Sequence, residues 1–452
     1  MCFAPPISMN TIEIRSLDMD ARGVGNLQNE DGTTGKVVFV DGALPGELVE
    51  FSTYKKKASW EAATMMSLVR ESSQRVAPKC EFFGTCGGCS MQHLDASAQV
   101  AMKQRVLEDN LWHISKIKSD IMLRPIIGPT WGYRYRARLS VRHVIKKGTV
   151  LVGFHEKKSR YVANMETCEI LPAHVSAMLM PLRGLVASLS IVEALPQIEL
   201  AIGEGVTAMV LRIMAPLTKD DEVKLKAFAD QYQVQWWLQT KGPDTAEPYY
   251  PATSDLHYLL PEFGVKMPFK PTDFTQVNHH INRVLVARAL RMLDVQKDER
   301  IADLFCGLGN FTLPIATLAK EVVGIEGSDT LTERALENAK HNGLAGKTSF
   351  STRNLFEVTA QDFVKLGKFD RFLIDPPRDG AMAVCQALID LGEIAPELKP
   401  KRLVYVSCSP STLARDAGML VNQAGYRLSS AGVINMFPHT SHVESMAVFD
   451  LI

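Results

Sequence analysis

In the C-terminal part of the chain, short apolar runs alternate with stretches in which apolar residues recur at helical spacing. Residues 299–305, 321–326 and 403–407 are such runs. Continuous apolar runs of this length are typical of parallel strands buried on both faces, and the amphipathic stretches between them predict crossover helices. We therefore predict a doubly wound α/β domain over residues 271–452, beginning after the proline-containing segment 268–271.

The N-terminal part has a different pattern. Short β-type segments at 12–15, 23–27 and 36–40 are broken by glycines, which predicts a small closed barrel over residues 9–70. The Gly-Val-Gly turn and the Val-Phe-Val-Asp-Gly-Ala-Leu-Pro-Gly-Glu run resemble a TRAM domain, an OB-like barrel found on RNA-modifying enzymes. Such barrels bind nucleic acid through an open face and loops. Lysines 55–57 are therefore candidates for phosphate contacts, with a solvated hairpin as the alternative.

Between these two parts, residues 71–270 contain a cysteine-rich segment, a predicted helix over 96–112 and a long mixed region. We predict a central α+β domain here, which gives a chain of three domains. A length of 452 residues with 46% hydrophobic and 22% charged positions fits a soluble multidomain protein.

The charge balance excludes one simple argument for a nucleic-acid partner. The chain has 50 basic and 50 acidic residues and a formal net charge of zero, so only local basic groups can favour RNA. The sequence has no apolar run of membrane-spanning length, and its first residues lack the features of a secretory signal. We expect a cytoplasmic monomer with no membrane partner.

A glycine loop follows the first predicted strand of the α/β domain. Cys306-Gly307-Leu308-Gly309-Asn310 leads into a predicted helix over 311–320, and the next strand ends at Glu326. Such glycines let the backbone approach a ligand, and an acidic residue after the second strand accepts hydrogen bonds from ribose hydroxyls. Thr312 stands where a dinucleotide-binding loop has its third glycine, which disfavours NAD. The loop resembles that of class I S-adenosyl-L-methionine-dependent methyltransferases.

Polar residues also follow the next three predicted strands: Asn354, Asp375 and Cys408. The ligand site of an open parallel sheet lies beyond the carboxyl ends of its strands. We therefore expect these side chains to meet the glycine loop in one crevice.

Two short motifs distinguish the atoms that could be methylated. In Asp375-Pro376-Pro377-Arg378, the arginine replaces both the aromatic residue of amino-group methyltransferases and the cysteine of RNA cytosine-5 methyltransferases. The candidate nucleophile follows the next strand, in Ser407-Cys408-Ser409-Pro410. With the segment 436–445, these motifs resemble the RNA uracil-5 methyltransferases, in particular the 23S rRNA enzymes with a TRAM domain and four cysteines. Ser409 stands where that family usually has Asn.

The resemblance implies methyl transfer from S-adenosyl-L-methionine to carbon 5 of a uridine in 23S rRNA. Cys408 would add to carbon 6 of the uracil, and Glu444 would be the general base that releases the product. The target base would first leave its stack. By the same resemblance, the cofactor contacts fall on Gln276, Phe305, Asn310, Glu326, Asn354 and Asp375.

Three alternatives remain at this stage. A tRNA uracil-5 methyltransferase, or an enzyme for another rRNA uridine, would share the same motifs. An inactive RNA-binding protein of ribosome assembly is opposed by the presence of both Cys408 and Glu444. A redox iron–sulfur protein is opposed by the complete cofactor crevice.

The remaining cysteines fall into two groups. Cys306 and Cys385 are expected to be small buried residues, whereas Cys80, Cys86, Cys89 and the remote Cys168 offer four thiolates. Four sulfurs suit tetrahedral zinc or a 4Fe–4S cluster, and spacing alone does not choose. The family resemblance favours 4Fe–4S. The fourth cysteine and the first spacing argue against radical adenosylmethionine chemistry.

Basic and aromatic residues are interleaved in the segment 133–143. Alternation along a strand would place Arg134, Arg136 and Arg138 on one face, beside rings that can stack on unpaired bases. We interpret this as an RNA-facing strand. His439 and His442 lack a third nearby ligand, so we expect substrate contact or packing from them and no metal site.

Overall fold

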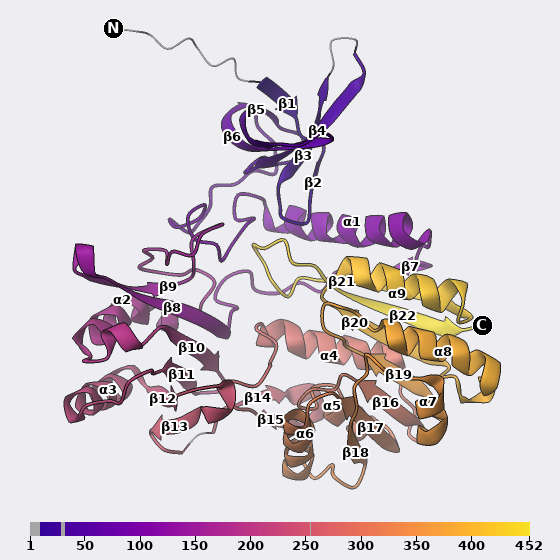
Figure 1. Cartoon of the computed structure of the whole chain (residues 1–452). Coiled ribbons are helices and arrows are strands. Elements are labelled where there is room, and N and C mark those ends of the chain that lie inside the picture. Colours follow the sequence, from indigo (N-terminus) through magenta and orange to yellow (C-terminus); the bar gives the residue numbers. More distant parts are fainter. Residues whose placement is uncertain (1–9, 29–31, 254) are drawn as a thin grey trace. The chain divides into compact units, whose positions relative to one another are not determined.

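The computed structural model describes residues 10–28, 32–253 and 255–452 (Figure 1). The chain divides into two compact units. The first extends to Lys103 and includes Phe437–His442, and the second comprises Gln104–Met436 and Val443–Ile452. No helix in the described ranges is both long and apolar enough to cross a membrane.

The first unit contains a curled sheet with the strand order β1-β5-β6-β4-β3-β2. The segment after β1 turns onto β3, where Arg15 N–H donates to the carbonyl of Val24 at 2.8 Å. A Cβ on Gly25 would lie 2.5 Å from the carbonyl oxygen of Glu13, so only glycine fits there. The strands are β1 (Asn10–Glu13), β2 (Ser16–Leu17), β3 (Gly23–Gln28), β4 (Thr34–Asp41), β5 (Leu48–Lys56) and β6 (Trp60–Arg70).

Alternate strand residues fill the inside of this curled sheet, among them Ile12, Val38, Val49 and Phe51. Each is at most 3% exposed, as the period of two along a strand requires. The predicted N-terminal barrel therefore has the expected all-β architecture and an apolar interior.

The segment 437–442 packs within the first unit through His439. The amide of Gln99 lies 3.2 Å from Nδ1 of His439, and the backbone N–H of His439 donates to Gln99 Oε1 at 2.8 Å. The carbonyl of His439 accepts hydrogen bonds from Ser90 and Met91. Of the two roles expected for His439, substrate contact or packing, these bonds favour packing.

The second unit contains a mixed sheet with the order β13-β12-β11-β10-β8-β9 and a two-stranded sheet of β14 and β15. The strand β8 corresponds to the predicted basic strand. The elements are α1 (Ala96–Ser115), which begins in the first unit, β8 (Arg136–Val144), β9 (Thr149–Gly153), α2 (Ala173–Ser188), β10 (Gln197–Ile202), β11 (Thr207–Arg212), α3 (Lys219–Tyr232), β12 (Val234–Gln239), β13 (Glu247–Tyr250), β14 (His257–Leu260) and β15 (Val265–Pro268).

The α/β part of the second unit is a sheet with the order β18-β17-β16-β19-β20-β22-β21-β7. The strands from β18 to β20 are parallel, and β22 is inserted antiparallel to both β20 and β21. The elements are β7 (Ile121–Met122), α4 (His279–Leu293), β16 (Arg300–Leu304), α5 (Thr312–Leu318), β17 (Glu321–Glu326), α6 (Asp329–His341), β18 (Thr348–Thr352), α7 (Ala360–Leu366), β19 (Arg371–Ile374), α8 (Met382–Ile394), β20 (Arg402–Ser407), α9 (Pro410–Asn422), β21 (Tyr426–Ile434) and β22 (Glu444–Leu451).

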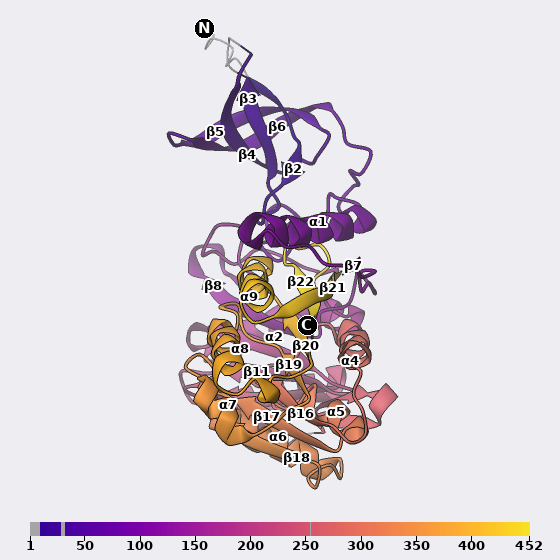
Figure 2. The same cartoon turned by 90° about the vertical axis from the view of Figure 1, so that its right-hand side faces the viewer.

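Helices cover both faces of this sheet. Figure 2 shows α4 and α5 on one side of the strands and α7, α8 and α9 on the other. The chain reverses its direction of winding at β16, which has β17 on one side and β19 on the other. In doubly wound sheets the ligand crevice lies at this switch point. The predicted doubly wound domain is confirmed.

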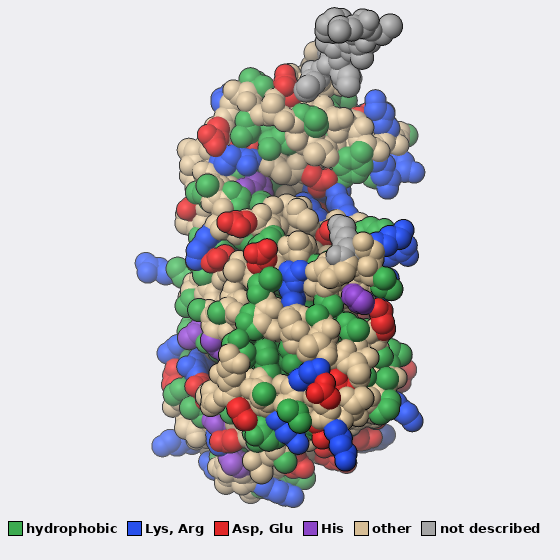
Figure 3. Space-filling model, turned by 90° about the vertical axis from the view of Figure 1, so that its left-hand side faces the viewer, with side chains coloured by type: hydrophobic (Ala, Val, Ile, Leu, Met, Phe, Trp, Pro, Cys, Tyr) green, Lys and Arg blue, Asp and Glu red, His purple; other side chains and the backbone are tan. Residues whose placement is uncertain are grey.

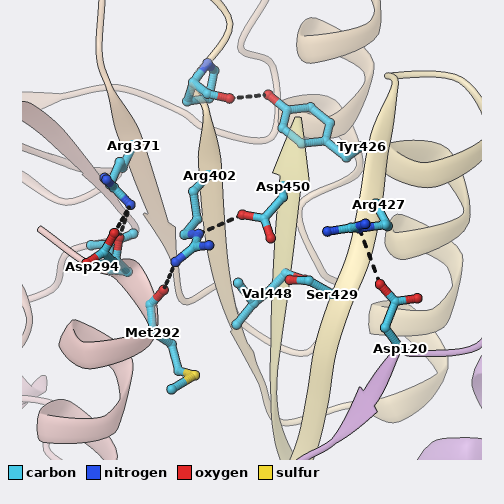
Figure 4. A network of polar contacts seen from close by, with 12 residues as sticks. Asp120, Met292, Asp294, Arg371, Arg402, Tyr426, Arg427, Ser429, Val448 and Asp450 are labelled. Atoms are coloured by element: carbon cyan, nitrogen blue, oxygen red, sulfur yellow. Dashed lines mark hydrogen bonds and ion pairs between the residues drawn. The ribbon is translucent and has the colours of Figure 1, made fainter. Parts of the chain in front are cut away.

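Arginine side chains form ion pairs and hydrogen bonds at the amino ends of the central strands (Figure 4). This edge of the sheet is opposite the crevice. Arg371, at the start of β19, donates to both carboxylate oxygens of Glu299 and to the carbonyl of Leu293. Arg402, at the start of β20, pairs with Asp450 at 2.6 Å and donates to the carbonyl of Met292. These contacts tie the last turn of α4 to the sheet.

Candidate active site

The glycine loop after β16 is a tight turn built from left-handed backbone positions. Phe305, Gly307 and Gly309 have φ values of +64°, +54° and +96°. The turn brings backbone N–H groups to the carboxylate of Glu326 at the end of β17. Gly307 donates to its Oε2 at 3.0 Å and Gly327 to its Oε1 at 2.8 Å. A carboxylate has about four acceptor positions, so Glu326 is oriented and still able to accept bonds from a ligand.

The side chain of Asn310 is held inside the unit. Its amide forms two hydrogen bonds with that of Asn282 on α4, at 2.9 and 3.0 Å, and its oxygen also accepts from the hydroxyl of Tyr258 at 2.9 Å. Asn282 and Tyr258 are 2% and 3% exposed. Sequence reasoning missed both, because they lie far from the loop in the chain and belong to no motif.

Thr312 has a structural reason to replace a third glycine. Its hydroxyl donates to the fully buried carboxyl of Asp303 at 2.5 Å. Burial raises the pKa of Asp303 to about 8, the charges of Asp375 and Glu326 add to the rise, and the bond from Thr312 opposes it. The other oxygen, Oδ1, has no hydrogen-bond partner. A pKa of about 8 leaves Asp303 mostly protonated near neutral pH, and a cation bound beside it would favour its ionised form.

Asn354 and Phe305 meet at the crevice rim. Asn354 follows β18, and its side-chain oxygen accepts a hydrogen bond from the N–H of Phe356 at 3.1 Å. The rings of Phe356 and Phe305 lie 5.7 Å apart between centroids. Gln276 lies just before α4, whose first turn is capped by Asn278 through a bond from Ile281 N–H. All six predicted cofactor residues thus belong to the second unit.

Cys408 and Glu444 both adjoin the carboxyl end of β20. The strands β20 and β22 pair antiparallel up to Ser407 opposite Ser445; Cys408 follows Ser407 in the chain, and Glu444 precedes Ser445. Burial raises the pKa of Cys408 to about 11, with further contributions from Glu444 and Asp375, while Arg378 lowers it. The predicted nucleophile and general base are therefore neighbours in space.

Asp375 is the second carboxyl group that acts on Cys408. Burial and the charge of Glu444 raise its pKa to about 8. Ser409, the residue that departs from the family pattern, is the N-cap of α9, where its hydroxyl accepts from Thr412 N–H at 3.5 Å. Serine and asparagine are comparable N-caps, so the replacement preserves the start of the helix after Cys408.

Comparisons with known proteins agree with this geometry. Residues 96–450 match the family described as tRNA (Uracil-5-)-methyltransferase. The chain belongs to this uracil-5 methyltransferase family. It is 66% identical over 439 residues to the 23S rRNA (uracil(1939)-C(5))-methyltransferase RlmD of Cupriavidus metallidurans, covering 97% of this chain and 94% of the relative. The RlmD of Ralstonia pickettii is 65% identical over 442 residues, with 97% and 98% covered.

A solved structure supports the fold of this family member. The tRNA (uracil-54, C5)-methyltransferase of Pyrococcus abyssi, in complex with S-adenosyl-L-homocysteine, superposes with a TM-score of 0.72 and 22% identity. The match covers 97% of this chain and 100% of the other. The Rossmann-like methyltransferase domain predicted from the sequence is therefore confirmed.

The cysteine site predicted for this uracil-5 methyltransferase family member is not assembled in the structure. The described ranges contain no group of three or more His, Cys, Asp or Glu side chains arranged to hold a metal ion. Cys80 and Cys86 are partly exposed thiols, and Gly88 N–H donates to the sulfur of Cys86 at 3.4 Å. Burial and Cys80 raise the pKa of Cys86. Cys306 and Cys385 are 4% and 0% exposed, as predicted.

The predicted basic face is only partly available for RNA. Arg136 donates to the carbonyls of Asp273 and Pro271, so its role is structural and the prediction is corrected there. Arg138 is 66% exposed and pairs with Glu199 at 3.0 Å, whereas Arg142 is exposed. Figure 3 shows Lys and Arg side chains interspersed with Asp and Glu on one face of the molecule. The surface in that view has no continuous basic field.

Proposed function

We propose that this protein transfers the methyl group of S-adenosyl-L-methionine to carbon 5 of a uracil in 23S rRNA. The observation that carries the proposal is that Cys408 and Glu444 adjoin the last residue pair of β20 and β22, Ser407 and Ser445, and that the charge of Glu444 raises the pKa of Cys408. The similarity to 23S rRNA methyltransferases at 65–66% identity over nearly the whole chain favours the uracil that their names give.

The cofactor would occupy the crevice beyond β16, β17, β18 and β19. Glu326 would accept hydrogen bonds from the ribose hydroxyls, and Asn354 and Asp375 would contact the remaining polar groups, with Gln276, Phe305 and Asn310. S-adenosyl-L-methionine supplies an activated methyl group and carries a positive charge at sulfur. A cation bound beside Asp303 and Asp375 would favour the ionised forms of these carboxyl groups, whose pKa values are raised to about 8.

Cys408 acts on the uracil before the methyl is transferred. Its thiolate forms a bond to carbon 6, and the electron pair of the carbon 5–carbon 6 double bond moves toward the oxygen on carbon 4. Carbon 5 of this enolate then takes the methyl, and the bond between that methyl and the sulfonium sulfur breaks. The sulfur leaves as a neutral thioether.

Glu444 completes the reaction as general base. It removes the proton from carbon 5, the double bond forms again and the sulfur–carbon 6 bond breaks, which releases Cys408 as a thiolate. Glu444 precedes Ser445, which pairs with the residue before Cys408, and this closeness supports a mechanism in which the two groups act on adjacent ring carbons.

The test is to incubate the protein with labelled cofactor and 23S rRNA fragments and to map the methylated base. Glu444→Gln is expected to accumulate a denaturation-resistant, methylated protein–RNA adduct. Cys408→Ala should lose turnover by about 10³-fold or more and form no adduct. Cys385→Ala is the matched control, since it removes a buried thiol outside the crevice. Methyl on cytosine or adenine, or full turnover by Cys408→Ala, would refute the proposal.

The cysteine-bound group is a second proposal. Brought together, Cys80, Cys86, Cys89 and Cys168 would provide four thiolates, a donor set that suits 4Fe–4S, with zinc as the alternative. The N–H···S bond to Cys86 is of the kind that stabilises thiolate ligands. Anaerobically purified protein should contain iron and sulfide; stoichiometric zinc without iron would decide for zinc. No step of the reaction passes through this group.

We also propose three domains over 9–70, 71–270 and 271–452 and a monomeric state. Limited proteolysis with mass analysis tests the boundaries, and light scattering tests the mass in solution.

A further inference from the structure

Hydrogen bonds from two side chains hold the loop after β19 at the residues on either side of Gly380. We call this segment the fastened loop. Arg415 Nη2 donates to the carbonyl of Asp379 at 2.8 Å, and Asp416 Oδ2 accepts from the N–H of Ala381 at 2.7 Å. Both side chains come from α9. The fastened loop is the one that carries Asp375 and, two positions before Gly380, Arg378.

Asp416 joins three elements of the site. Its carboxylate is 0% exposed and accepts, besides the bond from Ala381, a bond from the Tyr405 hydroxyl at 2.7 Å and one from Arg415 Nε at 2.8 Å. Tyr405 lies on β20, which ends one residue before Cys408, and α9 begins two residues after it. A buried carboxylate with every oxygen bonded holds its neighbours in one arrangement.

The position of Gly380 has no room for a side chain. Its φ is +79°, and a Cβ there would lie 2.6 Å from both Arg415 Nη2 and Asp416 Oδ2. The loop therefore contacts the two side chains through its bare backbone.

The fastened loop matters because of the charges that surround Cys408. Glu444 on β22 and Asp375 both raise the pKa of its thiol, and Arg378 is the cation that lowers it. The effect of a charge falls with distance. A small displacement of Arg378 therefore changes how readily Cys408 ionises.

We propose that Asp416, with Arg415, is a positioning residue for the nucleophile: it holds the loop so that Arg378 stays within electrostatic reach of Cys408 and favours the thiolate. The inference rests on the proposed role of Cys408. It assigns Asp416 no contact with substrate or cofactor. A purely structural Asp416 would change the stability of the unit without changing the ionisation of Cys408.

The test measures the alkylation rate of Cys408 by iodoacetamide as a function of pH, in the intact chain without RNA, by mass spectrometry of the Cys408 peptide. Asp416→Asn is expected to shift the profile upward by about 0.5–1 pH unit, which is about a threefold to tenfold lower rate below the pKa. Arg378→Gln should give a similar shift. In an Arg378→Gln background, Asp416→Asn should add little, because the cation it positions is absent.

Arg415→Gln is the second variant, since Asp416→Asn changes a fully buried group. Arg415 is partly exposed, so its loss should leave the chain folded by circular dichroism and still shift the profile upward. An unchanged profile in folded Arg415→Gln, or a full additional shift in the Arg378→Gln background, would overturn the inference. Because no uracil is used, either outcome is separate from failure of the proposed methyl transfer, which the adduct experiment measures.

Discussion

Cys408 has to act as a thiolate in surroundings that oppose ionisation. Its pKa is raised to about 11 by burial and by the carboxylates of Glu444 and Asp375. The opposing cation, Arg378, does not cancel these effects. The resting thiol is therefore protonated near neutral pH, and a positive charge bound in the crevice would favour the thiolate.

The cofactor can provide that charge, which gives a prediction for its binding. Alkylation of Cys408 should rise with pH up to about 11 in the ligand-free protein, because the thiolate is the reactive form. Saturating S-adenosyl-L-methionine should shift this profile to lower pH, by about 1 unit or more, relative to S-adenosyl-L-homocysteine. The two ligands differ by one methyl and one positive charge, so steric protection is matched. Identical profiles with both ligands would contradict the prediction.

A second residue-scale prediction concerns Asn282. Asn282→Ala removes both amide bonds to Asn310, so the glycine loop should lose part of its preorganisation. Affinity for S-adenosyl-L-methionine should fall about 5-fold to 50-fold by calorimetry, since lost hydrogen bonds leave a buried amide unsatisfied. The pH profile of Cys408 alkylation in the ligand-free protein should not move. Asn110→Ala is the control, because that amide bonds only its own helix at Val106.

Residues with a motif could be predicted from sequence, and residues that act only through tertiary contacts could not. Cys408 and Glu444 are recognisable from the segments around them, and the antiparallel pairing of β20 with β22 brings the residues next to them, Ser407 and Ser445, together. Asn282, Tyr258 and Asp416 contact the site from positions without any local signal. A sequence pattern does not tell which distant side chains a loop will meet.

At the scale of elements, strands and helices were predicted with ends that differ from the observed ones by up to a few residues. The strand at Glu321–Glu326 has the predicted bounds, whereas the helix predicted over 311–320 spans Thr312–Leu318. Helix ends depend on capping and on the start of the next element. The basic strand was predicted correctly as a strand, but Arg136 bonds two backbone carbonyls. The alternation of residues along a strand predicts on which face of the sheet a side chain lies. It does not predict which group that side chain will bond.

The arginines at the amino ends of the strands make the stability of the sheet testable. Arg371→Ala leaves the carboxylate of Glu299 buried without its cation, since the two residues are 11% and 9% exposed at the side chain. Hydrogen exchange of the β19 and β20 peptides should report a loss of about 3 kcal/mol in opening free energy. Arg427→Ala, which removes the exposed pair with Asp120, should cost less than about 1 kcal/mol. Equal effects of the two substitutions would show that burial of an ion pair does not change its contribution to the opening free energy.

At the scale of the whole molecule, a chain without net charge has to bind a polyanion. The 50 basic and 50 acidic residues balance, and several basic side chains are engaged in ion pairs, as Arg138 is with Glu199. Affinity for RNA should therefore depend on a few exposed cations. Lysines 55–57 at the end of β5 are all exposed, which makes them the most direct candidates.

Replacing Lys55, Lys56 and Lys57 together with alanine tests this view. If each neutralises one phosphate of a single-stranded segment, the slope of log K against log salt should become shallower by about 2, and RNA affinity at low salt should fall. Cofactor affinity should not change, because the crevice lies in the other unit. Lys224→Ala with Lys226→Ala is the matched control, since those lysines on α3 pair with Asp220 and Glu222 in their own helix. An unchanged salt slope in the triple variant would assign these lysines to a solvated hairpin and leave RNA affinity to other exposed cations.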